Sequence, residues 1–287
     1  MMSSRDLNLL FPEWQGHGEN DAVYRGAQKI ANELFAGVRF ATVPVRLEER
    51  LEVTRGVLGL ESIAASLRDA RAILTSQAPE RVFMIGGTCA SEVAPIAYLN
   101  RRYGGRMAVL WFDAHGDLNT PESSPSGHFH GMPLRALLGE GPPEIVGEVD
   151  LPLVTEQVFL VGARDFDPSE AALVAARSLY VAAPPVLGDG NDLLRAIRAR
   201  ELQRIYVHLD LDVLDPASFP DVLMPTRDGC RPSAIAALVR RLATRFDVVG
   251  FSIVEFCDKT GRGIDALRAL LEASGIRIGC CGATSVG

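Results

Sequence analysis

The sequence predicts a three-layer α/β/α domain with a mainly parallel sheet. Strand-length apolar runs alternate with helix-length amphipathic segments along all 287 residues. Several of these runs are continuously apolar, as strands covered by helices on both faces are. No Ser- and Gly-rich linker, internal repeat or low-complexity tract marks a boundary. We therefore expect residues 1–287 to form a single domain.

Six apolar runs are expected to form the strands. Each is five to seven residues long and rich in the branched and aromatic residues that fit a pleated sheet. They are residues 38–43, 81–85, 107–112, 157–161, 204–209 and 248–254.

Six segments between or after these runs are predicted to be helices. Their apolar residues recur at steps of three and four, and their opposite faces are rich in Arg. They are residues 60–76, 91–102, 168–177, 192–200, 232–245 and 263–274. Right-handed crossovers between parallel strands place such helices on both faces of a sheet.

Composition excludes several functional classes. The net charge of −7 argues against a nucleic-acid partner, because binding phosphates needs a basic face. No apolar run has transmembrane length, and the first residues lack the layout of a secretory signal, so we expect a cytoplasmic protein without a membrane partner. Five cysteines at no disulfide or zinc-finger spacing suit a reducing compartment. They are Cys89, Cys230, Cys257, Cys280 and Cys281.

Two clusters of ligand-type side chains follow two predicted strands. Asp113, His115 and Asp117 come directly after residues 107–112, and alternate residues of an extended backbone share one face. His208-Leu-Asp210-Leu-Asp212 repeats this spacing at the end of residues 204–209. Acidic groups gathered in one cleft without a cation would repel one another strongly. The pattern therefore predicts a hydrolytic centre with two metal ions.

Two further strand ends carry candidate site residues. Cys89 follows residues 81–85, and Glu255 follows residues 248–254. A single Asp after a strand is usually a helix cap or a turn former. The combination of Asp-x-His-x-Asp with Asp-x-Asp makes that interpretation much weaker here. Ligands of open α/β sheets bind beyond the carboxyl ends of the strands, so the polar loop 117–133 is expected to border the site.

At these positions the chain resembles the ureohydrolase family, which includes arginases and agmatinases. The similarity runs from about Arg81 to Asp258, and its motifs appear in family order. They are Gly86-Gly-Thr-Cys-Ala-Ser91, Asp113-Ala-His-Gly-Asp117, His130-Gly-Met-Pro133, His208-Leu-Asp-Leu-Asp-Val-Leu-Asp-Pro216 and Val254-Glu255.

The resemblance implies a bridged pair of divalent ions, with Mn²⁺ favoured by the oxygen-rich ligands. It assigns Cys89, Asp113, Asp117 and Asp210 to the first ion, and Asp113, His115, Asp210 and Asp212 to the second. It also implies catalytic roles: Glu255 orients the guanidinium, Asp117 passes a proton to the leaving amine, and His130 protonates the product or shuttles protons to solvent.

A loop similar to that of the arginase branch implies the substrate. By this resemblance Asn119 and Ser126 hold an α-carboxylate, while Asp167 and Glu170 face an α-amino group. Amide and hydroxyl donors suit a carboxylate, and carboxylates suit an ammonium. Asp167 and Glu170 also fit helix N-capping, which is compatible with the same role. We therefore expect a guanidino α-amino acid as substrate.

The chain departs from the family where Thr88-Cys89 stands in place of Asp-His. A thiolate is a softer ligand, so Zn²⁺, Fe²⁺ or Co²⁺ could replace Mn²⁺. This replacement resembles the Nω-hydroxy-L-arginine amidinohydrolase of D-cycloserine biosynthesis, which has the same change. The likeness is partial, because that enzyme lacks a histidine at the position of His130. Leu223-Met-Pro225 and Phe256-Cys-Asp258 also differ from the family pattern and indicate an altered specificity wall.

The expected function is cleavage of arginine or a close analogue to ornithine and urea by a binuclear-metal amidinohydrolase. One alternative is release of hydroxyurea from Nω-hydroxy-L-arginine. The other is a metal-depleted, arginase-like binding or regulatory protein. The family resemblance also suggests a homo-oligomer, either a trimer or a hexamer. Segment 14–18 is interpreted either as a cover over the site entrance or as a packing turn.

Overall fold

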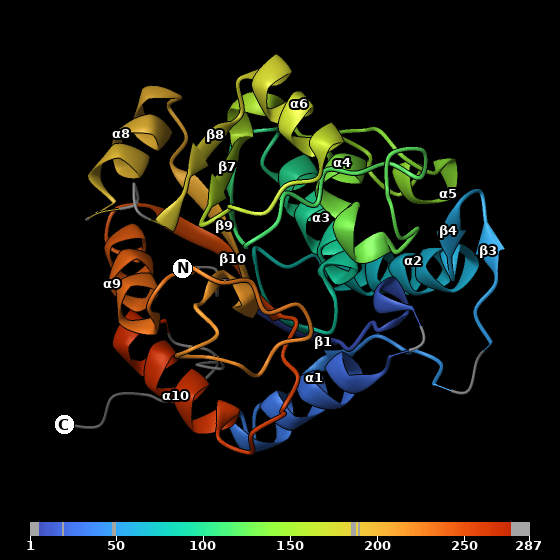
Figure 1. Ribbon diagram of the computed structural model, residues 1–287, viewed down its shortest axis with the longest axis horizontal. Coiled ribbons are helices and arrows are strands. Elements are labelled where there is room, and N and C mark those ends of the chain that lie inside the picture. The colour runs from blue at the N-terminus through green and yellow to red at the C-terminus, as the bar shows by residue number, and fades with distance from the viewer. Residues whose placement is uncertain (1–5, 19, 48–49, 185–187, 189, 277–287) are drawn as a thin grey trace.

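The computed structural model describes residues 6–18, 20–47, 50–184, 188 and 190–276 (Figure 1). Eight strands form one sheet in the order β2-β1-β5-β10-β9-β6-β7-β8, and all of its neighbouring strands run parallel. Helices cover both faces of this sheet. The predicted three-layer α/β/α class is confirmed.

Four strands form the middle of the sheet, and two more lie on each side. The central four are β5 (Arg81–Gly86), β10 (Asp247–Val254), β9 (Arg204–Asp210) and β6 (Met107–Phe112). The outer strands are β2 (Ala41–Thr42), β1 (Asp6–Phe11), β7 (Val158–Val161) and β8 (Tyr180–Ala182). A separate antiparallel pair is formed by β3 (Val53–Thr54) and β4 (Val57–Leu58).

Two hydrophobic cores lie between the sheet and its helical layers. Helices α2 (Leu60–Gln77), α3 (Val93–Arg102), α4 (Pro133–Leu137), α5 (Pro143–Val146) and α6 (Pro168–Arg177) contribute to one core. The other contains side chains of α1 (Ala22–Glu33), α8 (Asn191–Ala199), α9 (Pro232–Ala243) and α10 (Gly263–Ser274). All six predicted helices are present close to their predicted bounds.

The sequence prediction missed β1, α1 and β8. Strand β1 is an outer strand, but it is a full part of the sheet, because it pairs with β5 along six residues. Its apolar run is interrupted by the polar Asn8, so the run is too short to stand out from an N-terminal tail. Strand β8 has only three residues. In the described ranges, no helix combines the length and apolarity needed to cross a bilayer.

Candidate metal centre

Four neighbouring strands bring the predicted metal ligands and the predicted catalytic Glu255 to one edge of the sheet. Because β5, β10, β9 and β6 are adjacent and parallel, their carboxyl ends meet there. Cys89 begins the 3₁₀ helix η2 (Cys89–Glu92) after β5, and Asp210 ends β9 before the 3₁₀ helix η5 (Leu211–Val213). Asp113 and Glu255 follow β6 and β10 directly.

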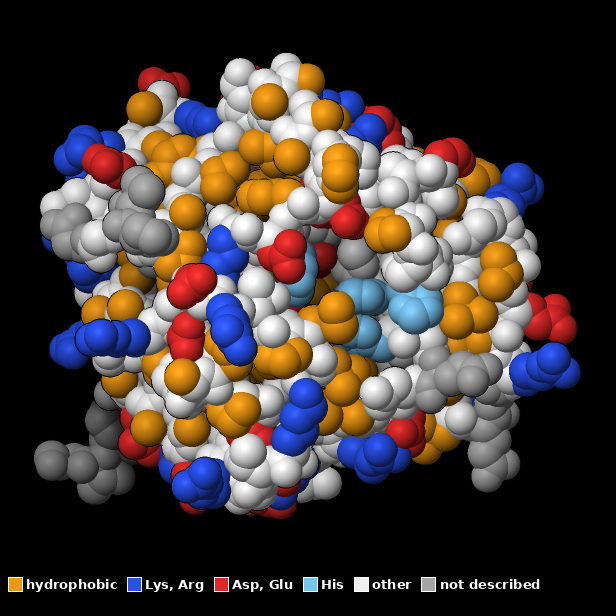
Figure 2. All heavy atoms as spheres, in the orientation of Figure 1, with side chains coloured by type: hydrophobic (Ala, Val, Ile, Leu, Met, Phe, Trp, Pro, Cys, Tyr) orange, Lys and Arg blue, Asp and Glu red, His pale blue; other side chains and the backbone are white. Residues whose placement is uncertain are grey.

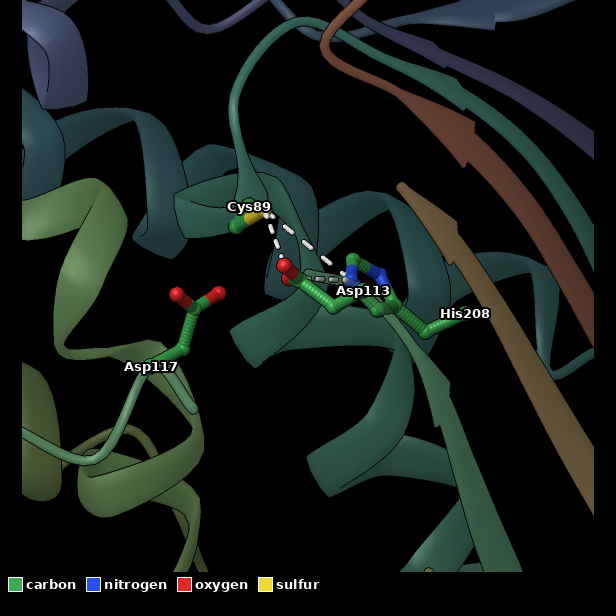
Figure 3. A group of neighbouring side chains, drawn as sticks. All are labelled: Cys89, Asp113, Asp117 and His208. Atoms are coloured by element: carbon green, nitrogen blue, oxygen red, sulfur yellow. Dashed lines mark hydrogen bonds and ion pairs between the residues drawn. The ribbon is translucent and has the colours of Figure 1, made fainter. Parts of the chain in front are cut away.

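One donor group, which we call the first donor cluster, consists of Cys89, Asp113, Asp117 and His208. Its four buried donor atoms lie within 4.8 Å of one another (Figure 3). The Cys89 sulfur lies 3.9 Å from Asp113 Oδ2. Asp117 faces the other three side chains, and its buried Oδ2 has no hydrogen-bond partner among the described residues. An unpartnered buried carboxylate oxygen is suited to binding a cation.

The second donor cluster consists of Asp113, His115 and Asp212, so Asp113 belongs to both clusters. Nδ1 of His115 lies 2.9 Å from Asp212 Oδ2 and 3.4 Å from Asp113 Oδ1. Asp210 lies between the clusters, with Oδ2 3.1 Å from the Cys89 sulfur and Oδ1 accepting a hydrogen bond from the Asp212 amide at 2.7 Å. A carboxylate shared by two clusters is the arrangement that a bridged metal pair needs.

The electrostatics of these clusters fit bound cations. Burial and the neighbouring carboxylates raise the pKa of Asp117 and Asp210 well above the ordinary value, and they raise that of Asp212 to about 6. Burial and the Asp117 charge also raise the pKa of the Cys89 thiol. These groups therefore resist carrying negative charge together. Divalent cations would offset that repulsion, and the donors present suit them.

The two predicted catalytic acids have unusual backbone conformations. Asp117 has φ of +53° and Glu255 has φ of +65°, a region that non-glycine residues rarely adopt. Glu255 is held there by two contacts with the β5–η2 loop: its amide donates to the Gly87 carbonyl at 2.7 Å, and its Oε1 accepts from the Cys89 amide at 3.1 Å. Such locally strained residues cluster at functional sites.

Two histidines of the site were not assigned roles from the sequence. His208 lies in the first donor cluster. His17, on the 3₁₀ helix η1 (Gln15–His17), has Nε2 2.5 Å from Glu255 Oε2, and its ring stacks on His130 with centroids 4.0 Å apart. Burial and the His17 charge lower the pKa of His130 well below its ordinary value. The sequence pointed to His17 only indirectly, through the interpretation of segment 14–18 as a cover over the site entrance.

A cavity of about 480 Å³ opens above the second donor cluster. In Figure 2, histidine side chains gather in a hollow near the middle of this face, with acidic side chains beside them. The predicted loop 117–133 lines much of the cavity, as expected, and Leu223 and Met224 form part of another wall. The lining residues are His17, Asn20, His115, Asp117, Asn119, Ser124, Pro125, Ser126, His128, His130, Gly131, Asp165, Asp167, Glu170, Leu223 and Met224. Among them are four acidic residues and no Lys or Arg.

The four predicted substrate-binding residues all line this cavity. Asn119 Nδ2 donates to Asp167 Oδ2 at 2.8 Å, which fixes the amide beside a carboxylate. Both oxygens of Glu170 accept backbone N–H groups, from Leu118 at 2.8 Å and Asp167 at 2.9 Å. Ser126 is exposed at the cavity edge. Glu170 thus caps α6 and also ties loop 117–133 to that helix.

Three of the cysteines lie in the described part of the chain, and all three are buried and free. Only Cys89 is in a donor cluster. Cys230 packs in the core beside α9, as a small apolar residue does. The predictions for Cys280 and Cys281 concern positions outside the described residues.

This fold and its donor clusters define an α/β protein with a candidate metal centre beneath a small-molecule cavity. The chain belongs to the arginase family, because the sequence model of that family matches residues 21–263. It is 33% identical over 146 residues to an arginase of Staphylococcus aureus strain COL, and this match covers 48% of the chain and 47% of that relative. The chain therefore spans about half the length of the curated relatives it matches.

Solved structures of several ureohydrolases share the fold. An arginase of Entamoeba histolytica, crystallised in complex with L-ornithine, superposes with a TM-score of 0.84 at 21% identity, covering 96% of this chain and 99% of the other. Proclavaminate amidino hydrolase of Streptomyces clavuligerus superposes with a TM-score of 0.72 at 20% identity, covering 94% and 90%. At these identities the likeness concerns the fold alone.

Proposed function

We propose that this protein is a metal-dependent amidinohydrolase that cleaves the guanidino group of arginine or a close analogue to ornithine and urea. The observation that carries the proposal is an acidic cavity that reaches the donor clusters at His115 and Asp117. A guanidinium is a planar cation that carboxylates bind well. Membership of the arginase family supports the same reaction class.

Two divalent metal ions, Mn²⁺ in the first instance, fit the donor set. Cys89, Asp113, Asp117 and Asp210 would hold the first, and Asp113, His115, Asp210 and Asp212 the second. When bound, such a pair supplies activation of water and stabilisation of negative charge at neutral pH. The sulfur of Cys89 makes Zn²⁺, Fe²⁺ or Co²⁺ further candidates.

The protein's own groups orient the substrate and move protons. Glu255 orients the guanidinium, and its contact with His17 fixes the Oε2 atom. Asp117 takes the proton of the attacking water on a carboxylate oxygen that does not hold the ion, and passes it toward the leaving amine. His130 lines the cavity and is neutral at pH 7, so it can relay a proton between solvent and the product amine.

Four residues of the cavity lining are suited to an α-amino acid. Asp167 and Glu170 supply negative charge for the α-ammonium, and Asn119 with Ser126 supplies donors for the α-carboxylate. The hydrogen bond from Asn119 to Asp167 keeps the amide and the carboxylate side by side. The α-carboxylate and the α-ammonium of one substrate can therefore contact Asn119 and Asp167 at the same time.

Cys89 supports a second candidate substrate, Nω-hydroxy-L-arginine, whose hydroxyl changes the basicity of the guanidine. The deciding experiment incubates the purified chain, loaded with Mn²⁺, Co²⁺ or Zn²⁺ in turn, with each substrate and measures urea and hydroxyurea. Urea from arginine supports the proposal, and hydroxyurea alone supports the second candidate. No turnover with any metal, together with fewer than one tightly bound ion per chain, supports a non-enzymatic binding or regulatory role.

We also propose that the protein is cytoplasmic and assembles as a homotrimer or homohexamer. The first suggestion rests on its cysteine usage and the second on the family resemblance. Size-exclusion chromatography with light scattering measures the assembly directly.

A further inference from the structure

His208 lies where the first donor cluster needs an imidazole. The ring is fully buried on β9, and its Nε2 lies 3.5 Å from Asp113 Oδ2 and 3.9 Å from the Cys89 sulfur. Figure 3 shows the ring beside Asp113 and Cys89, with Asp117 across from them. Two atoms that each lie about 2.0–2.3 Å from one tetrahedral ion are separated by about 3.3–3.8 Å. The observed separations are close to that spacing.

The other ring nitrogen is held by a buried carboxylate. Nδ1 of His208 lies 2.9 Å from Glu92 Oε1, and Glu92 is itself fully buried on η2. The Tyr206 hydroxyl donates to Glu92 Oε2 at 2.7 Å, so both carboxylate oxygens have partners. Metal-binding histidines usually donate the N–H of their other ring nitrogen to a carboxylate, a backbone carbonyl or a water, which fixes the tautomer and the ring orientation.

The surrounding packing keeps the imidazole in this orientation. Trp111 stacks on the His208 ring with centroids 3.7 Å apart, and its indole N–H donates to Asp113 Oδ2 at 3.1 Å. Residue 250 of β10 is a glycine, and the Tyr206 ring occupies the space beside it. A Cβ atom at position 250 would overlap that ring. Glu92 thus contacts one nitrogen of the His208 ring, and the other nitrogen faces Asp113 and Cys89. The packing of Trp111 and Tyr206 holds these groups in place.

We propose that His208 is a ligand of the first metal ion through Nε2, and that Glu92 is the residue that positions it. This inference rests on the proposed function, because it concerns the same metal pair. The family has a histidine at the position of Cys89, and here β9, which lies two strands away from β5 in the sheet, supplies an imidazole to the same cluster. With a thiolate, an imidazole and carboxylates, the first site favours a borderline ion such as Zn²⁺ or Co²⁺ over Mn²⁺.

The test measures Co²⁺ binding to the full chain by metal analysis and by the visible absorption of the bound ion. We expect two ions per chain in the native protein. His208→Ala should lose the first ion or bind it at least tenfold more weakly, with a changed Co²⁺ spectrum. Glu92→Gln should lower the affinity for that ion by about 10–100-fold, while the chain still binds two ions. His128→Asn, a histidine of the cavity outside both clusters, should keep both ions and the native spectrum.

A crystal structure of the native protein grown with Co²⁺ or Zn²⁺ tests the same point without any substitution, which matters if His208→Ala does not fold. A His208 Nε2–metal distance of about 2.0–2.1 Å supports the inference. An ion at Cys89 and Asp113 with Nε2 more than about 3 Å away overturns it.

The outcomes separate this inference from the proposed function. Two ions and guanidino hydrolysis in the native chain, with unchanged Co²⁺ affinity and spectrum in His208→Ala, overturn only the role of His208. A native chain that binds no ion and turns over no guanidino substrate overturns both proposals.

Discussion

Nε2 of His17 and Oε2 of Glu255 lie 2.5 Å apart, although the two residues are 238 positions apart in the sequence. Both side chains are buried, and the contact joins the N-terminal segment to the end of β10. His17 precedes the residues that the family model matches. The positioning of Glu255 therefore depends on a part of the chain that the family match does not cover.

We expect His17→Ala to lower kcat for a guanidino substrate at least tenfold while leaving two metal ions per chain. The reason is that Glu255 loses the group that fixes its Oε2, while the donor clusters keep their residues. Steady-state kinetics and metal analysis of the same preparation measure both effects. His17→Gln retains a hydrogen-bond donor and should recover part of the loss. Loss of metal in His17→Ala would instead assign His17 a role in metal binding.

His115→Ala and Asp210→Ala should each abolish activity and reduce the bound metal. His115 belongs to the second donor cluster, and Asp210 contacts the Cys89 sulfur and the Asp212 amide. The matched control is Asp192→Asn on α8, whose carboxylate is exposed and contacts only Arg195 in the described ranges. Full activity in either metal-loaded variant contradicts the ligand assignment.

Cys89→His should shift metal preference toward Mn²⁺. A neutral imidazole in place of a thiolate removes the soft, anionic donor from the first cluster. Competition between Zn²⁺ and Mn²⁺, measured by metal analysis after equilibration with both, shows the preference in each protein. Cys257→Ser is the control for a buried thiol outside the clusters. An unchanged Zn²⁺ to Mn²⁺ ratio in Cys89→His means that residue 89 does not contact the ion.

Asp167→Asn should raise KM for arginine about tenfold with little change in kcat. Asp167 lines the cavity and belongs to neither donor cluster, so we expect it to affect binding of the α-ammonium more than the chemistry. A guanidino acid that lacks the α-amino group serves as the matched substrate, and its KM should rise much less. Equal changes for both substrates argue against contact between Asp167 and the α-ammonium.

Glu13 should contribute to a fall in the stability of the metal-free protein between about pH 5 and pH 7. Burial raises the pKa of Glu13 from 4.5 to about 7, even though Thr88 and the Gly16 amide donate hydrogen bonds to it. The folded state therefore keeps a proton that the unfolded state releases as the pH rises. The corresponding loss of unfolding free energy is about 3 kcal/mol, complete above the folded-state pKa.

Urea unfolding of the metal-free chain at pH 5 and pH 8 measures this dependence. Glu13→Gln keeps the shape of the side chain without its charge. It should be more stable than the native chain at pH 8 and should lose the part of the pH dependence that Glu13 contributes, while the buried carboxyls of the donor clusters keep theirs. The same pH dependence in both proteins assigns the effect to other groups.

The sequence was sufficient to predict the central strands of the sheet and that their carboxyl ends lie together. Continuous apolar runs and amphipathic segments identified the central strands and six helices, because buried parallel strands and surface helices have different periodicities. Strand β1 could not be identified in this way, since Asn8 interrupts it and only its pairing with β5 makes it part of the sheet.

The candidate site was predictable where the donors lie close in sequence, as Asp113, His115 and Asp117 do. The contacts of His17 and His208 depend instead on folding. His17 contacts Glu255 only because η1 lies beside the end of β10. The proposed role of His208 depends on its contact with Glu92, which lies on a different element. The sequence spacing placed His208 beside Asp210 and Asp212 in a cluster of ligand-type side chains, but it did not show which ion or partner the ring contacts.

The central claim is that donors from β5, β6 and β9 hold two neighbouring divalent ions. The most direct test is the number of ions per chain, measured by metal analysis after loading with Mn²⁺, Co²⁺ or Zn²⁺ and extensive desalting. The account predicts two ions per native chain with at least one of these metals. Fewer than one ion per chain with all three contradicts it.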